Sequence, residues 1–135
     1  MIQLKSKREL EKMREAGRHV GEILQRLGEL AKPGVTTAEL DRVAHAEIRA
    51  RKLESSFLGY APGDNPPFPA VICASVNEEI VHGIPGGRRP VEGDLLKIDF
   101  GAVSDGFHAD AAITVAIGEV DEESRRLVST TLSSL

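Results

Sequence analysis

The sequence contains one cysteine, Cys73, among its 135 residues. A single cysteine cannot form an internal disulfide, and this scarcity is typical of the reducing cytoplasm, so we expect a cytoplasmic protein. No stretch approaches the ~20 apolar residues of a membrane span. The charged N-terminus also lacks the apolar segment of a secretory signal, so we expect neither export nor a membrane partner.

The charges are not of one sign, and the formal net charge is only −4. Such a balance does not favour nucleic acid as a partner. Hydrophobic residues at 41% and charged residues at 28% are ordinary for a globular protein. We find no internal repeat, low-complexity tract or linker, and therefore interpret residues 1–135 as a single domain.

Two amphipathic helices are predicted in the first part of the chain, over residues 7–31 and 37–53. Each begins at a capping box, Ser6 with Glu9 and Thr36 with Glu39. Apolar residues follow at helical spacings, and a Lys-Pro-Gly sequence at 32–34 ends the first helix. Helices with one apolar face each need a surface to cover.

A sheet is predicted to supply that surface. Residues 54–69 are rich in proline and are predicted to have no regular secondary structure. Short runs rich in Val and Ile follow at 70–76, 78–84, 94–102 and 107–117, separated by turn signals too close for parallel crossovers. Residues 121–135 read as a further helix. The pattern predicts an α+β fold, with an antiparallel sheet and two helices packed on one of its faces.

Asp99 and Asp110 flank the turn signal Ser104-Asp105-Gly106 in the last two predicted strands. A two-residue turn pairs Gly101 with Asp110 and places Asp99 one diagonal step away, and a four-residue loop pairs the aspartates directly. Both registers leave the carboxylates on one face, whereas a three-residue loop separates them. Two close carboxylates repel unless a cation or a shared proton compensates, and hard oxygen ligands suit divalent metals. Solvated aspartates beside a hairpin are the alternative, although the apolar neighbours of both residues argue against it.

His82 ends the predicted strand at 78–84, and its ordinary pKa near neutrality suits a ligand, a general acid or a substrate hydrogen-bond donor. A structural histidine is the alternative. His108 alternates with Asp110 and should share its face, as support for a metal site or as a structural residue. Cys73 reads as a core residue rather than a nucleophile.

Together these segments resemble the N-terminal part of a type I methionine aminopeptidase. The runs that carry the likeness are FLGY at 57–60, FPAVICASVNEEIVHGIP at 68–85, GDLLKIDFGA at 93–102 and DGFHAD at 105–110. The resemblance implies half of a pita-bread fold, whose two α+β halves are related by a pseudo-twofold axis. It also implies hydrolytic removal of the initiator methionine from new polypeptides, so that N-terminal methionine peptides are the partners.

By this resemblance, Asp99 and Asp110 match two ligands of a dinuclear metal site, and His82 matches the catalytic histidine that contacts substrate. Further residues match the pocket for the methionine side chain: Tyr60, Phe68, Cys73 and Phe57. The metal would be manganese, cobalt, iron or zinc.

The remaining ligands of that family, one histidine and two glutamates, come from a second half of the fold. Glu119, Glu122 and Glu123 do not match them. We therefore interpret the chain as a truncated N-terminal half whose activity alone is weak or absent. The alternatives are a non-catalytic metal-binding or folding module that homodimerises through the surface of the missing half, and a half-enzyme that acts as a homodimer or with the missing half supplied in trans.

Overall fold

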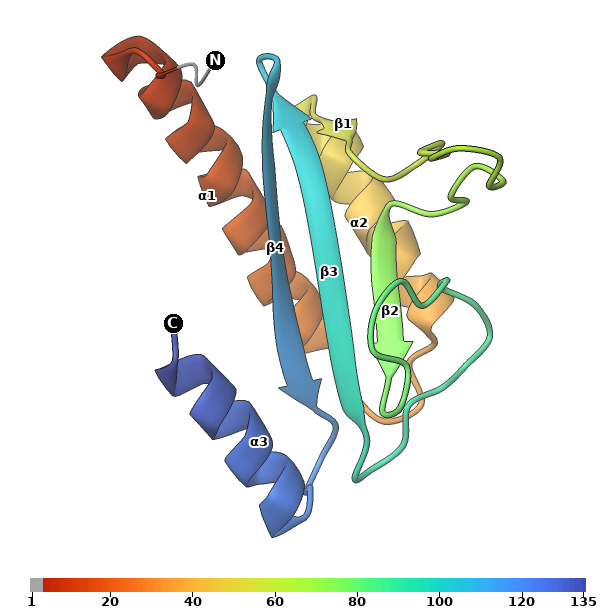
Figure 1. The fold of residues 1–135 in the computed structure, drawn as a ribbon. Coiled ribbons are helices and arrows are strands. Elements are labelled where there is room, and N and C mark those ends of the chain that lie inside the picture. Colours follow the sequence, from red (N-terminus) through yellow and green to blue (C-terminus); the bar gives the residue numbers. More distant parts are fainter. Residues whose placement is uncertain (1–3) are drawn as a thin grey trace.

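The computed structural model describes residues 4–135, which form three helices and one four-stranded antiparallel sheet (Figure 1). Strand β3 lies at the centre of the sheet. Strand β4 pairs with its whole length, and β1 and β2 pair with different parts of it. In chain order the elements are α1 (Lys7–Leu30), α2 (Thr37–Arg51), β1 (Glu54–Ser55), β2 (Ile72–Val76), β3 (Leu95–Ser104), β4 (Phe107–Ala116) and α3 (Glu122–Ser133).

Both predicted capping boxes are present and begin the first two helices. The amide of Glu9 donates to the Ser6 hydroxyl at 3.3 Å, and the amide of Glu39 donates to the Thr36 hydroxyl at 3.1 Å. Each glutamate accepts in return from the amide of its capping residue. Helix α2 ends two residues earlier than predicted, because Lys52 adopts a left-handed conformation with a φ of 56°.

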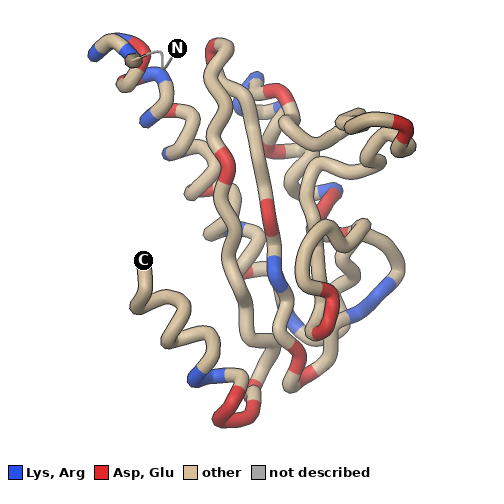
Figure 2. The backbone as a smooth tube through the Cα atoms, in the orientation of Figure 1, with Lys and Arg blue, Asp and Glu red and all other residues tan. Residues whose placement is uncertain are grey.

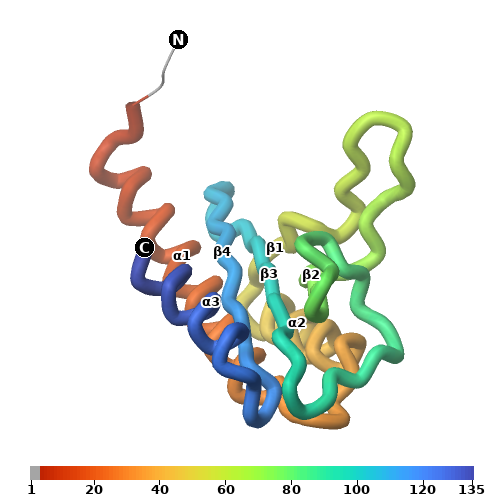
Figure 3. Tube along the Cα trace, turned by 60° about the horizontal axis from the view of Figure 1, so that its bottom comes forward, coloured from red at the N-terminus to blue at the C-terminus, as the bar shows by residue number. Residues whose placement is uncertain are grey.

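The core lies between the sheet and the first two helices, whose backbones Figure 3 shows from a second direction. Strand β3 has buried apolar residues on one face, while its other face includes Lys97, Asp99 and Gly101 between the half-buried Leu95 and Val103. The apolar face packs on α1 and α2, which confirms the predicted packing of two helices on one face. The opposite face of the sheet, called here the open face, has no helix over it among the described residues. The buried side chains of β3 are Leu96, Ile98, Phe100 and Ala102.

The hairpin between β3 and β4 closes through the two-residue turn Asp105-Gly106. Both residues have a positive φ, 50° and 82°, as the mirror-image turns that match strand twist require. Ser104 pairs with Phe107, and the register then places Gly101 opposite Asp110. Of the alternatives left open by the sequence, the two-residue turn is the one that forms.

The predicted strand at 78–84 is wrong. Residues 77–84 form a turn and an irregular loop, because the positive φ values of Asn77 and His82 interrupt an extended backbone, although Gly83 still bonds to the outer edge of β2. Strand β1 was missed, because a two-residue strand carries no alternation. Helix α3 forms near its predicted position but contributes no buried residue to the core.

Across residues 4–135, no helix combines the length and apolarity needed to cross a membrane. One ion-pair cluster joins α1 to α2, where buried Glu47 accepts from Arg26 and, at 3.0 Å, from Arg51. Figure 2 shows acidic residues within β3 and β4 themselves, and both lie on the open face rather than in the core.

Candidate metal and substrate site

Asp99 and Asp110 project from neighbouring strands onto the open face. Asp110 is directly opposite Gly101, so the two aspartates are diagonal neighbours. Gly101 makes room for this meeting, because a Cβ at its position would lie 3.0 Å from Oδ2 of Asp110 and 2.9 Å from the ring of Phe57. The two-residue turn and the missing side chain of Gly101 together bring the carboxylates into one place.

The electrostatics of the pair are unfavourable in the absence of a cation. Burial raises the pKa of Asp99, and the charge of Asp110 and a hydrogen bond with it raise it further, while a charged His82 opposes the shift. Oδ1 of Asp99 is buried and has no hydrogen-bond partner among the residues described. Buried polar atoms are nearly always satisfied, so this atom points to a missing partner.

A divalent cation fits this arrangement. It would neutralise two repelling carboxylates and give the unpaired oxygen a ligand bond, and hard oxygen donors are what such ions prefer. Within residues 4–135, however, no group of three or more His, Cys, Asp or Glu side chains gathers in a geometry that could hold a metal. The described chain thus offers two carboxylates as candidate ligands, which is fewer than a tightly held ion usually has.

A groove of about 630 Å³ opens beside the carboxylates. It is walled by the loop after β1, by β2 and by the loop that follows β2. All seven residues named from the sequence line this one groove: Phe57, Tyr60, Phe68, Cys73, His82, Asp99 and Asp110. The structure therefore places them together, while the role of each stays a prediction.

The aromatic wall is held by backbone bonds across the loop 61–67. The amide of Phe68 donates to the carbonyl of Tyr60 at 2.9 Å, and the amide of Gly59 donates to the carbonyl of Phe68 at 2.9 Å. The rings of Phe57 and Phe68 meet edge to face, with centroids 6.4 Å apart. Tyr60 remains 63% exposed, so this wall is open on its outer side.

Cys73 closes the floor of the groove from β2, directly opposite Asp99. Burial raises the pKa of its thiol to about 11, and the charges of Asp99 and Asp110 add to the shift. A thiol with that pKa stays protonated at neutral pH. Cys73 therefore contributes a small apolar surface to the groove. This agrees with the prediction that Cys73 is a core residue rather than a nucleophile.

His82 lies on the loop after β2 rather than on a strand, and its φ of 61° is in the left-handed region. Six further lining residues were not among the predicted site residues: Ser56, Pro62, Asn65, Pro66, Ile84 and His108, of which only His108 was predicted to share the face of Asp110. Ile84 belongs to the VHGIP run and was within reach of the sequence. Ser56 gave no signal, yet its hydroxyl lies 3.0 Å from Nδ1 of His108 and fixes that ring beside the groove.

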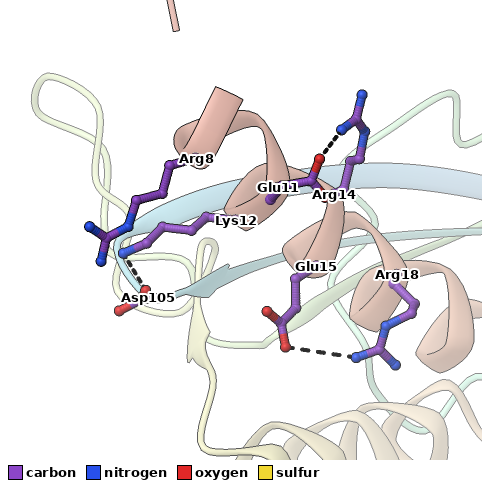
Figure 4. A pocket seen from close by; sticks show the side chains of 7 residues that line it. All are labelled: Arg8, Glu11, Lys12, Arg14, Glu15, Arg18 and Asp105. Carbon is purple, nitrogen blue, oxygen red and sulfur yellow. Dashed lines mark hydrogen bonds and ion pairs between the residues drawn. The ribbon is translucent and has the colours of Figure 1, made fainter. Parts of the chain in front are cut away.

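A second hollow of about 590 Å³ lies along the first half of α1 (Figure 4). Most of the charged side chains that line it form ion pairs with one another: Lys12 pairs with Asp105, Arg14 with Glu11, and Arg18 lies 3.9 Å from Glu15. Lys12 also stands 5.8 Å over the ring of Phe107. This hollow ties the hairpin turn to α1, and Arg8 is the one lining residue that makes no ion pair within the described chain.

The family model of metallopeptidase family M24 matches residues 11–135. The chain therefore belongs to metallopeptidase family M24, whose description as metallopeptidases agrees with a divalent metal at the carboxylates. An Xaa-Pro dipeptidase from Bacillus anthracis shares the pita-bread fold, with a TM-score of 0.77 and 19% identity over 97% of this chain and 34% of that one.

The stronger similarities are to methionine aminopeptidases. That of Clostridium acetobutylicum is 48% identical over 99% of this chain and 52% of its own length. The crystal structure of that of Thermotoga maritima has a TM-score of 0.92 and 34% identity, over 100% of this chain and 53% of that one. The resemblance predicted from the sequence, and with it half of a pita-bread fold, is confirmed. The chain spans about half the length of the curated relatives it matches.

Proposed function

We propose that this chain provides part of the active site of a metal-dependent aminopeptidase that removes N-terminal methionine from polypeptides. The observation that carries the proposal is the unpaired, buried Oδ1 of Asp99 beside a second carboxylate, at one end of a groove with an aromatic wall. A structural carboxylate pair would need a shared proton or a neighbouring cationic side chain, and a catalytic metal removes that need.

Asp99 and Asp110 would hold the metal, either manganese, cobalt, iron or zinc. When bound, such an ion supplies an activated water and polarises the carbonyl of the first peptide bond. His82, on the loop beside the carboxylates, would donate a hydrogen bond to the substrate as charge develops on it. The imidazole suits this task because a ring N–H is a hydrogen-bond donor.

The groove would receive the methionine side chain. Phe57, Tyr60 and Phe68 present aromatic surface, against which a thioether makes favourable contacts. The protonated thiol of Cys73 adds a small, polarisable floor. A charged side chain in this groove would be desolvated next to two carboxylates, so an acidic P1 residue should be rejected most strongly.

The site needs more ligands than the described chain brings. We propose that they come from a second half, as the length of the relatives suggests, or from a second copy of this chain. Strand β4 supports the idea of a partner, because its outer edge pairs with no strand of the described chain.

The experiment is hydrolysis of a Met-Ala-Ser peptide with added manganese or cobalt, with and without chelator, over a range of protein concentrations. Asp110→Asn is the test variant, and Asp64→Asn, an exposed loop aspartate, is the matched control. Release of methionine that chelator and Asp110→Asn both abolish supports the proposal, and a rate that rises faster than protein concentration indicates a working dimer. Release that survives chelator, or that Asp110→Asn leaves intact, contradicts it.

The second candidate function is a non-catalytic metal-binding module that homodimerises. It is favoured by the count of only two carboxylate ligands within residues 4–135. This candidate predicts a dimer in sedimentation equilibrium that manganese stabilises, with no peptide hydrolysis at any concentration. A monomer indifferent to metal would count against it.

A further inference from the structure

Ser75 is a polar residue in an unusual place. It lies on β2 two residues after Cys73, on the same open face as the carboxylates, yet it is only 2% exposed. The loop that follows β2 folds back over this position and buries it. Buried hydroxyl groups in proteins almost always have a hydrogen-bond partner, so the partner of Ser75 indicates what this hydroxyl does in the structure.

That partner is the backbone of Gly83. The amide of Gly83 donates to the Ser75 hydroxyl at 2.9 Å, and the carbonyl of Gly83 accepts from the amide of Ala74 at 2.8 Å. Both polar groups of one loop residue are therefore bonded to consecutive residues of β2. The approach is so close that a Cβ on Gly83 would lie 2.4 Å from the carbonyl oxygen of Ala74.

His82 is the residue immediately before this contact. Its φ of 61° is a conformation that residues other than glycine seldom adopt without support from their surroundings. The residues around His82 give this conformation little support. Val81 and Ile84 are exposed, and the imidazole makes no hydrogen bond within the part of the chain that the structure describes. The two bonds at Gly83 are thus the nearest restraint on the direction in which His82 points.

We propose that Ser75 is a positioning residue, whose hydroxyl clamps the His82-Gly83 turn onto β2 and so holds the imidazole of His82 beside Asp99 and Asp110. This inference rests on the proposed role of His82 in binding substrate. Ser75 itself lines no part of the groove and touches no reacting atom. Its effect passes through one backbone amide.

The test compares the unmodified chain with Ser75→Ala, which removes the acceptor, and Ser75→Thr, which keeps it. Ser104→Ala, a serine at the end of β3 whose side chain makes no hydrogen bond in the described chain, is the matched control. Hydrogen exchange measured by NMR reports the clamp directly. In Ser75→Ala the amides of Gly83 and Ala74 should exchange roughly fivefold faster or more. The amide of Asn77, bonded to Leu95, should not change.

Two further NMR signals follow His82 itself. Its Cα and Cβ shifts report the left-handed backbone, and broadening of its ring signal by added Mn²⁺ reports its distance from the carboxylates. His45 on α2 and His19 on α1 serve as internal references, because both helices lie behind the opposite face of the sheet. Ser75→Ala should move the backbone shifts and reduce the broadening of His82, and Ser75→Thr should restore both.

Unchanged exchange of Gly83 in Ser75→Ala would overturn the inference, since the hydroxyl would then hold nothing. Faster exchange with unaltered broadening of His82 would also overturn it, because the clamp would not reach the ring. If Mn²⁺ broadens no histidine of the unmodified chain, the proposed metal site fails instead. The exchange rates and the backbone shifts of His82 then decide the role of Ser75 without the metal.

Discussion

Replacing Asp99 by asparagine should stabilise the metal-free protein at neutral pH. The pKa of Asp99 is raised in the folded chain by burial and by Asp110, so ionisation favours unfolding. The stability that the protonated form contributes is complete below the unfolded pKa, near 3.9, and is lost as the pH rises through the higher folded pKa. Asparagine never ionises and avoids that loss.

The buried, unpaired Oδ1 sets the magnitude. Leaving a buried polar atom unsatisfied costs about 1–3 kcal/mol and more when the group is charged, and a neutral amide avoids the part of the cost that comes from the charge. We therefore expect Asp99→Asn to gain about 1 kcal/mol at pH 7 in the presence of chelator, which for a chain of this size is a rise in Tm of about 3–5 °C. At pH 3 the gain should vanish, because the carboxyl is then protonated in both states.

The assay is urea unfolding followed by circular dichroism, at pH 7 and pH 3, with chelator and then with manganese. Asp110→Asn is the informative comparison, since it relieves the same repulsion but leaves the buried oxygen of Asp99 unpaired, and should gain less. Manganese at ten times its Kd should stabilise the unmodified chain by about 1.4 kcal/mol and Asp99→Asn by much less. If Asp99→Asn is the less stable protein in chelator at pH 7, the reasoning from burial and repulsion is refuted.

Three other substitutions or reactions test separate parts of the structure. Glu47→Gln should cost about 1–2 kcal/mol of unfolding free energy, because it weakens the charged hydrogen bond from Arg26 on α1 and the one from Arg51 within α2; an unchanged urea midpoint would show that the cluster contributes no stability. Gly106→Ala should cost about 1–2 kcal/mol, since its φ of 82° disfavours a Cβ, and a hairpin of unaltered stability would contradict the turn assigned here. Iodoacetamide should alkylate Cys73 roughly a hundredfold more slowly at pH 8 than a free thiol, with a rate that climbs toward pH 11, and rapid labelling would rule out the raised pKa.

The parts of the fold that could be predicted from sequence are those with a strong local signal. Capping boxes marked the starts of α1 and α2, and alternation marked β3. The prediction of a strand at 78–84 was wrong, because the left-handed conformations of Asn77 and His82 turn the backbone away from an extended course beside β2. Those conformations depend on contacts such as the bond between Gly83 and Ala74, which the apolar pattern of seven residues does not report.

The residues of the site also differ in how far they could be predicted from the sequence. Asp99, Asp110 and their common face followed from the even side-chain period of a hairpin, although the turn length was needed to fix their register. The clamp from Ser75 to Gly83 was not visible, because a serine in an apolar run reads as an ordinary strand residue. The place of Ser56 beside His108 depends on contacts 52 residues apart in sequence, which no local pattern reports.

The two-residue turn also sets when the carboxylates first meet. Asp99 and Asp110 belong to a single hairpin, so their approach needs no distant segment and should follow hairpin closure on a scale of roughly 1–10 μs. The groove, by contrast, forms only when β1, β2 and the loop 61–67 have docked. These contacts close loops with a much larger separation in sequence. A folding chain should therefore hold a repelling acidic pair before the groove beside it has formed, and a divalent ion bound to that pair would relieve the repulsion.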